Sequence, residues 1–239
     1  MKDDRLPAAA ALGALLALGL AVGGGLVGRA IYRVKATERY VTVRGLSERE
    51  VPANLAMWPM TFGVAGDDLG QVQSALEGAT GKIAAFLKGK GFDEKEFSVS
   101  SPRVNDFEAQ GIRGQDRPLH RYAAESTVTL RSEKVDLVRA TMASAGELVR
   151  SGVALRNDYG SSPRFLYTAL ESIKPPMIVE ATKDARRAAE QFASDSGSHV
   201  GAIRKAQQGY FAIEDRDEFS PEVKKVRVVT TVEYELRDD

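Results

Sequence analysis

The chain has 239 residues and carries 33 basic and 33 acidic side chains, so its formal net charge at neutral pH is zero. This balance argues against a nucleic-acid partner, because such a surface needs basic side chains concentrated in one stripe or patch. The chain contains no cysteine, which excludes disulfides, thiolate metal sites and cysteine nucleophiles.

An uncharged run extends from Leu6 to Gly28, between Arg5 and Arg29. At about 1.5 Å per helical residue, its 23 residues reach roughly 34 Å, which is enough to cross a hydrocarbon core of about 30 Å. We therefore predict a single transmembrane anchor over this run. The alternative is a cleavable signal peptide with its apolar core at residues 12–20, although no clean Ala-x-Ala site follows.

Two glycine pairs in this run have the four-residue spacing that lets transmembrane helices approach closely. They are Gly19 with Gly23 and Gly24 with Gly28, and they are our candidate contacts between two anchors. The alternative is that small residues only fill the span. The run holds six glycines and seven alanines, so such pairs arise readily by chance.

The charges around the run bear on its orientation. Basic residues predominate in the linker at residues 29–39, whereas Lys2 and Arg5 are offset by Asp3 and Asp4. The positive-inside rule alone therefore places the C-terminal domain in the cytoplasm. The family resemblance given below implies the opposite orientation.

After the linker, the chain alternates between the two-residue period of strands and the longer period of amphipathic helices. Expected strands cover residues 40–44, 55–64, 96–103, 120–131, 152–156, 164–170, 202–213 and 225–237. Expected helices cover residues 67–88, 132–150 and 175–196. This order predicts an α+β fold with helices packed on largely antiparallel sheets, and the strands at 96–103 and 120–131 are expected to form a hairpin.

Prolines and small residues sharpen two of these predictions. Pro52 and Pro59 cannot donate ladder hydrogen bonds, so the second strand is expected at a sheet edge or with a bulge. Pro175 and Pro176 are expected to begin the third helix. Its predicted inner face is formed by Ile178, Ala181, Ala185, Ala188, Ala189 and Phe192.

A long connection at residues 104–119 separates two of the expected strands. It holds Phe107 and Ile112 as isolated apolar residues among polar ones. Long ordered loops are often functional or interfacial, so these two residues are candidate oligomer contacts. The alternative is a mobile loop with two tethering contacts.

No catalytic, cofactor-binding or metal-binding motif stands out. His120 and His199 are 79 positions apart and lack neighbouring motifs. Residues 197–201 lack the serine of a nucleophile elbow, and the acidic segment 214–222 lacks the glycine of a calcium loop. Gly81-Lys82 lacks the spacing of a phosphate loop. We expect no enzyme activity, although paired carboxylates of a hydrolase need not be adjacent in sequence.

Three segments of the chain have distinctive sequences. The first is Val-Thr-Val-Arg-Gly at 41–45, followed by Pro-Ala-Asn at 52–54, and the second is the strand that begins at Tyr122. The third is 181–190, with Asp-Ala-Arg followed by Ala-Glu, and Gly197, Gly201 and Ile203 come after it. Together these segments resemble the SIMPL (DUF541, YggE-like) family of bacterial envelope proteins. The chain departs from the family pattern at 45–47, where Gly-Leu-Ser replaces a frequent Gly-Glu-Gly.

The resemblance implies a periplasmic or envelope-facing domain, often oligomeric, that is loosely associated with envelope and oxidative stress and has no established catalytic site. The predicted organisation is a tail at 1–5, an anchor at 6–28, a linker at 29–39 and a SIMPL domain at 40–237. We expect a non-catalytic, self-associating protein of the inner membrane with its domain in the periplasm. The alternatives are a binding module for another envelope protein or wall component, and an unrecognised hydrolase.

Overall fold

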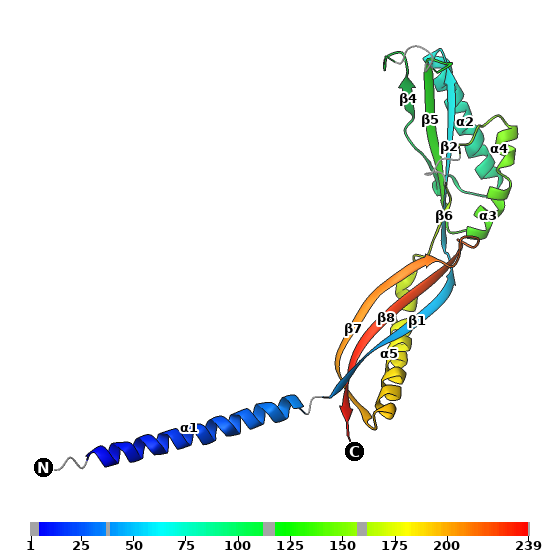
Figure 1. Ribbon diagram of the computed structural model, residues 1–239. Coiled ribbons are helices and arrows are strands. Elements are labelled where there is room, and N and C mark those ends of the chain that lie inside the picture. Colours follow the sequence, from blue (N-terminus) through cyan, green and yellow to red (C-terminus); the bar gives the residue numbers. More distant parts are fainter. Residues whose placement is uncertain (1–4, 37–38, 112–117, 157–161, 239) are drawn as a thin grey trace. The chain divides into compact units, whose positions relative to one another are not determined.

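The computed structural model describes residues 5–36, 39–111, 118–156 and 162–238, which divide into two compact units. Unit 1 comprises Met1–Ser47, Pro176–Tyr210 and Val228–Asp239, and unit 2 comprises Glu48–Pro175 and Phe211–Arg227. The elements, labelled in Figure 1, are α1 (Arg5–Ala36), β1 (Tyr40–Pro52), β2 (Leu55–Gly66), α2 (Leu69–Gly89), η1 (Glu94–Glu96), β3 (Phe97–Val99), β4 (Arg103–Asp106), β5 (Tyr122–Ser132), α3 (Val135–Ala143), α4 (Gly146–Arg150), β6 (Arg164–Leu166), α5 (Leu170–Asp195), β7 (His199–Asp215) and β8 (Val223–Arg237). The α+β prediction is confirmed.

Unit 2 is built on a five-stranded sheet with the order β3-β5-β2-β6, in which β4 also pairs with β5. The pairings are antiparallel, and β2 follows β5 from Ala56 opposite Ser132 to Gly66 opposite Tyr122. Because side chains alternate along a strand, one face of the sheet collects large apolar residues and packs against α2. This core includes Trp58, Met60, Phe62, Leu76, Ile83, Leu87, Val128 and Leu130.

Helix α2 shows how local sequence sets an element's limits. The Asp68 side chain accepts a hydrogen bond from the Gln71 amide at 2.8 Å, which satisfies one of the free donors at the helix start. Just past the helix end, Gly91 adopts a φ of 94°, a conformation that glycine takes without steric cost. The helix predicted over 67–88 is therefore confirmed within two residues at either end.

Helix α5 packs on a three-stranded sheet with the order β1-β8-β7, and most of this helix and sheet belongs to unit 1 (Figure 1). Its core cluster consists of Val43, Ala185, Ala189, Val232 and Tyr234. Helix and sheet approach so closely that a Cβ on Gly45 would lie 1.8 Å from the Ala181 carbonyl oxygen. The small side chains of α5 thus allow the close packing that the sequence predicts.

The helix predicted over 132–150 is instead two helices, α3 and α4. Between them, the amides of Ser144 and Glu147 bond to carbonyls three residues back rather than four. The Thr141 hydroxyl also bonds back to the Leu137 carbonyl at 2.7 Å, an interaction that bends helices. Ser132 ends β5 and accepts the Lys134 amide, so the predicted helix start there was wrong.

Helix α5 begins at Leu170, before the two prolines that were predicted to start it. Pro175 and Pro176 lie in its second turn, where each removes one helical hydrogen bond. The inner face also differs, because Phe192 is 59% exposed whereas Met177 and Ala193 are buried. The buried residues follow each other at intervals of four, so the close contact is a narrow strip of mostly alanines that excludes the large phenylalanine ring.

Strand β2 lies between β5 and β6 over Leu55–Met57 only, so the predicted edge position is wrong at the start of the strand but holds at Pro59. Pro59 is tolerated because β6 pairs only with Leu55–Met57, which leaves the ladder on that side open at the proline. The strand predicted at 152–156 is a single bridge between Leu155 and Phe62. The one predicted at 96–103 forms β3, which pairs with β5 as the predicted hairpin requires. Strand β4 overlaps that range only at Arg103, and the rest of it falls in the segment predicted as a connection.

The N-terminal segment forms one helix, α1. Its apolar side chains between Gly13 and Arg29 are exposed. In the part of the chain that the structure describes, no helix meets the combined length and apolarity that crossing a membrane requires. The transmembrane anchor over 6–28 accordingly stays a prediction.

Candidate functional site

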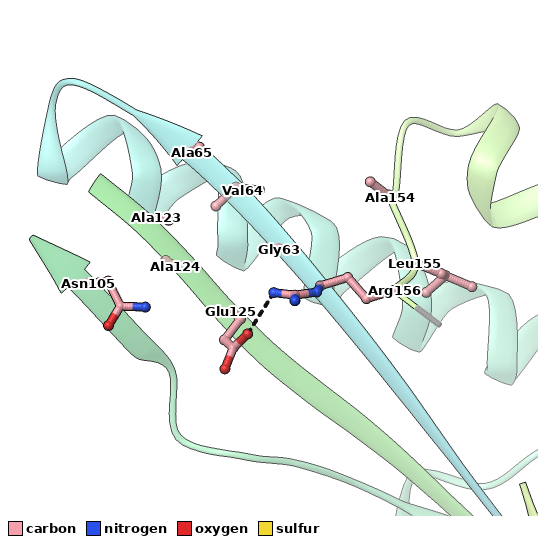
Figure 2. A pocket seen from close by; sticks show the side chains of 10 residues that line it. All are labelled: Gly63, Val64, Ala65, Asn105, Ala123, Ala124, Glu125, Ala154, Leu155 and Arg156. Carbon is pink, nitrogen blue, oxygen red and sulfur yellow. Dashed lines mark hydrogen bonds and ion pairs between the residues drawn. The ribbon is translucent and has the colours of Figure 1, made fainter. Parts of the chain in front are cut away.

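A hollow of about 330 Å³ lies at one end of the five-stranded sheet in unit 2 (Figure 2). Strands β2, β4 and β5 and the segment 154–156 contribute to it. Its lining residues are Gly63, Val64, Ala65, Asn105, Ala123, Ala124, Glu125, Ala154, Leu155 and Arg156. The space exists because the strand ends carry glycine and alanine where the middle of the sheet carries larger residues.

Backbone pairing places Arg156 at this hollow. Its amide donates to the Thr61 carbonyl at 2.8 Å, so segment 154–156 continues along the β2 edge beyond β6. From there the Arg156 side chain crosses β2 at Gly63 (Figure 2). A Cβ added to Gly63 would lie 3.3 Å from the Ala124 carbonyl oxygen but 3.9 Å from the arginine Cδ, so the neighbouring strand crowds this position more than the arginine does.

The carboxylate of Glu125 is held by two arginines at the rim of the hollow. Arg156 Nη1 lies 2.9 Å from Glu125 Oε2, and Arg103 Nη1 lies 3.1 Å from Glu125 Oε1. Both carboxylate oxygens therefore have a guanidinium partner, and the central charge is compensated. Partly exposed pairs of this kind contribute about 0–1 kcal/mol each, so they order the rim more than they stabilise the fold.

The lining chemistry suits binding better than catalysis. Apart from Glu125 and Arg156, the lining is apolar except for the Asn105 amide. An arginine stays protonated in proteins and cannot act as a general base, and a carboxylate with both oxygens ion-paired is poorly placed to accept a proton. The hollow offers an apolar floor with a polar rim, which fits a small apolar group on a peptide or ligand.

The histidine at this same end of the sheet has a structural role. His120 Nδ1 lies 3.3 Å from Asp67 Oδ2, and the same carboxylate accepts the Arg121 amide at 3.0 Å. The Arg121 guanidinium bonds to Asp106 at 3.0 Å and to Glu108 at 2.9 Å. The hydrogen bond from Arg121 holds the pKa of Asp106 below its usual value, and this network ties the ends of β4 and β5 together.

The second histidine lines a different hollow, of about 380 Å³, in unit 1. Glu190 is the one carboxylate among its seven lining residues, so His199 is not surrounded by clustered carboxylates there. Within the described ranges, no group of three or more histidine, aspartate and glutamate side chains is arranged to hold a metal ion.

Sequence reasoning missed one charged hub in unit 2, centred on Glu96. Its carboxylate accepts hydrogen bonds from the Ser132 hydroxyl at 2.5 Å, the Lys134 ammonium at 2.9 Å and the Asp93 amide at 2.9 Å. Burial raises the pKa of Glu96, but these donors lower it by more, and the pKa lies below its usual value. The capping-box spacing of Asp93 and Glu96 is the local signal that could have revealed the hub.

The predicted contact residues fall in different places. Phe107 is half-buried next to β4, and its amide donates to the Arg121 carbonyl at 3.0 Å, whereas Ile112 lies outside the described residues. The anchor candidates Gly19, Gly23, Gly24 and Gly28 lie on α1, where an added Cβ would meet no described atom within 4 Å. The structure contains a single copy of the chain, so contacts between copies stay predictions for all six residues.

Comparison with known proteins bears directly on the resemblance seen in the sequence. No curated protein matches the chain. The sequence model of one family, described as SIMPL, protein of unknown function (DUF541), matches residues 41–234. The match covers most of the chain and includes the strands of both sheets together with α2 and α5. The chain therefore belongs to the SIMPL (DUF541) family.

Proposed function

We propose that this SIMPL-family chain is a non-catalytic protein of the inner membrane, with its domain in the periplasm, and that it associates with further copies of itself. It would thereby contribute to envelope integrity or to protection against oxidative stress. The observation that carries the non-catalytic part is the pairing of both Glu125 oxygens with Arg103 and Arg156 at the candidate site. This arrangement supports a surface that binds rather than one that moves protons.

The membrane tether rests on the uncharged run from Leu6 to Gly28, and the periplasmic side rests only on what the resemblance to the SIMPL family implies. Fusing alkaline phosphatase after Asp239 tests the orientation, because that enzyme requires export for activity. We expect an active fusion. A stably produced but inactive fusion would place the domain in the cytoplasm, as the basic linker at 29–39 favours.

Self-association is tested by the mass of the full-length chain in detergent, measured by light scattering after gel filtration. We expect a discrete multimer whose mass, corrected for bound detergent, is a whole multiple of the 25.9 kDa chain. A monomer at all tested concentrations would contradict the proposal. Cleavage of the N-terminal segment is read from the mass of the mature chain in the same sample.

A second candidate function is a tethered binding module for another envelope protein, and the hollow at Glu125 favours it. Its apolar floor and polar rim have the character of a peptide-binding surface. The replacement Ala123→Leu fills this hollow from β5, and Gln73→Leu on the exposed side of α2 is a control of similar size and apolarity. Loss of an envelope partner with Ala123→Leu alone, in a chain that stays monomeric, would favour this second function.

A further inference from the structure

Strand β7 forms an open edge of the three-stranded sheet. Among the described residues, the order β1-β8-β7 leaves one side of β7 without a neighbouring strand (Figure 1). The strand is 17 residues long and contains no proline, so every residue has the amide that a further strand needs, and Arg204 and Lys205 are its basic residues. An edge of this length is well above the usual strand length of about five or six residues.

The opposite edge of the same sheet is protected. On β1, the Leu46 amide donates to the Asp184 carboxylate of α5 at 2.9 Å, and β1 ends at Pro52. Both features hinder strand pairing at their positions, since the Leu46 amide is already used and Pro52 has none. Because the β1 edge is protected at these positions, β7 is the edge of this sheet that is better suited to pair with a further strand.

The side chains of β7 are exposed on both of its faces. Tyr210 is 99% exposed and Ile203 is 50% exposed, and Ile213 is also exposed. Proteins usually protect long edge strands with charges that point inward, with bulges or with a covering segment. A strand with exposed apolar residues on both faces is typical of a surface that is covered in the assembled protein.

The charge distribution along β7 identifies what pairs with it. Its first half carries Arg204 and Lys205, and its second half ends in Glu214 and Asp215. Within the chain, Asp215 is also ion-paired with Lys224 of β8 and Arg204 lies over the Tyr40 ring, so the contact with a second copy would add to these interactions. In an antiparallel pair of two β7 strands, the basic half of one copy lies against the acidic half of the other. A parallel, in-register pair would place like charges side by side, which is unfavourable.

The charges on each face of the strand also favour antiparallel pairing. Arg204 and Glu214 share one face, and Lys205 and Asp215 share the other, because residues separated by an even number lie on the same side. A two-fold axis near Gly209 sets one of these pairs directly opposite and the other on the diagonal, and both positions are within contact distance. The opposite charges of the two copies therefore still face each other if the axis passes near Tyr210 rather than Gly209.

We propose that two copies of this chain associate through antiparallel pairing of their β7 strands about a two-fold axis near Gly209–Tyr210, with Arg204 and Lys205 of one copy facing Glu214 and Asp215 of the other. This inference rests on the proposed self-association and names the surface that performs it. Pairing joins the two three-stranded sheets into one six-stranded sheet and covers the exposed side chains of both strands.

Single-cysteine variants test this arrangement, because the natural chain contains no cysteine. Gln208→Cys and Tyr210→Cys lie at the centre of β7, and Ala202→Cys lies on the same face near its start. Gly209 itself is unsuitable, because a Cβ there would lie 2.5 Å from the Val229 carbonyl oxygen. Each full-length variant is treated in detergent with a short thiol cross-linker and analysed on a denaturing gel.

Antiparallel pairing brings each central cysteine close to the same cysteine of the other chain. The two cysteines at position 202 instead lie about 48 Å apart along the strands, at about 3.4 Å per residue. We therefore expect strong cross-linking of Gln208→Cys or Tyr210→Cys and only background cross-linking of Ala202→Cys. Gln73→Cys, on the exposed side of α2, measures that background. Two central positions keep the test valid if one variant fails to fold.

Every other pattern overturns the inference. Equal cross-linking at the three positions would show parallel pairing, and background values at all three would exclude a β7 contact. The mass of the untreated full-length chain separates the two proposals. A multimer without a central cross-link would refute β7 pairing and leave self-association standing, whereas a monomer would refute both.

Discussion

The two units achieve their packing in opposite ways. The sheet of unit 2 buries large side chains such as Trp58 and Phe62 against α2, whereas unit 1 brings α5 onto its sheet through alanines and Gly45. Filling space with large residues makes a core sensitive to truncation, because removal leaves a cavity. Close approach of small residues makes a core sensitive to enlargement. The two units should therefore respond in opposite ways to a change in side-chain volume.

The largest effect is expected from truncation in unit 2. Phe62→Ala removes a ring that is 1% exposed and should destabilise the unit by about 4 kcal/mol, through lost burial and the cavity that remains. Phe219→Ala is the matched control, because Phe219 is 92% exposed and its loss should cost less than about 0.5 kcal/mol. Urea unfolding of both variants measures the difference, and equal midpoints would show that Phe62 is not a core residue.

The second prediction concerns enlargement in unit 1. In Gly45→Ala, the new methyl group would lie 1.8 Å from the Ala181 carbonyl oxygen and 2.4 Å from the Ala185 amide nitrogen. Neither backbone atom can move without shifting α5, so we expect a loss of about 3 kcal/mol. Gly78→Ala in α2 has open space around it and should stabilise by about 0.5–1 kcal/mol. Stabilisation by both replacements would disprove the close approach.

A smaller effect is expected where a polar contact protects the β1 edge. Asp184→Ala leaves the Leu46 amide without its carboxylate partner and also removes the 2.7 Å ion pair with Arg187. We expect a loss of about 1–2 kcal/mol, mainly from the hydrogen bond to the charged group. Glu190→Ala removes a comparable exposed pair with Arg186 and should cost only about 0.3 kcal/mol. Thermal unfolding compares them, and equal losses would mean that the Leu46 contact contributes nothing.

The smallest effect depends on pH and belongs to unit 2. The folded-state pKa of Glu96 lies below its ordinary value of 4.5, so its stabilisation is complete above that value and is lost as the pH falls through the folded-state pKa. Glu96→Gln should destabilise by roughly 1 kcal/mol at neutral pH and weaken the fall in stability on acidification. Glu94→Gln, at a largely exposed carboxylate, is the control. Identical pH profiles of wild type and Glu96→Gln would contradict the assignment.

Local patterns predicted the fold where the determining residues are close in sequence. The apolar period and the Asp68 cap located α2, and alternation located β5 and β8. Prediction failed where distant residues decide. Phe192 looked like a core residue from its type and spacing, but the buried strip of α5 runs at intervals of four from Met177 to Ala193, and Phe192 lies beside it with 59% of its surface exposed. The position of that strip depends on the sheet that packs on α5, which the sequence near residue 192 does not specify.

The candidate site was beyond sequence reasoning for the same reason. Arg103 and Arg156 reach Glu125 from positions 22 and 31 residues away, and no local motif links the three. They meet because β4 pairs with β5 and because residues 154–156 extend the sheet beside β2. By contrast, the sequence shows that β7 has a basic first half and an acidic second half, but only the sheet order shows that this strand is an edge.

The central claim is assembly through the β7 edge, and a pair of charge reversals in the full-length chain tests it most directly. Glu214→Lys places a positive charge against Arg204 of the other copy, whereas Glu218→Lys makes the same change in the exposed loop after β7. Light scattering in detergent should show a multimer for wild type and Glu218→Lys, and association weakened roughly tenfold for Glu214→Lys. A multimer of equal mass and equal concentration dependence in all three proteins would contradict the account.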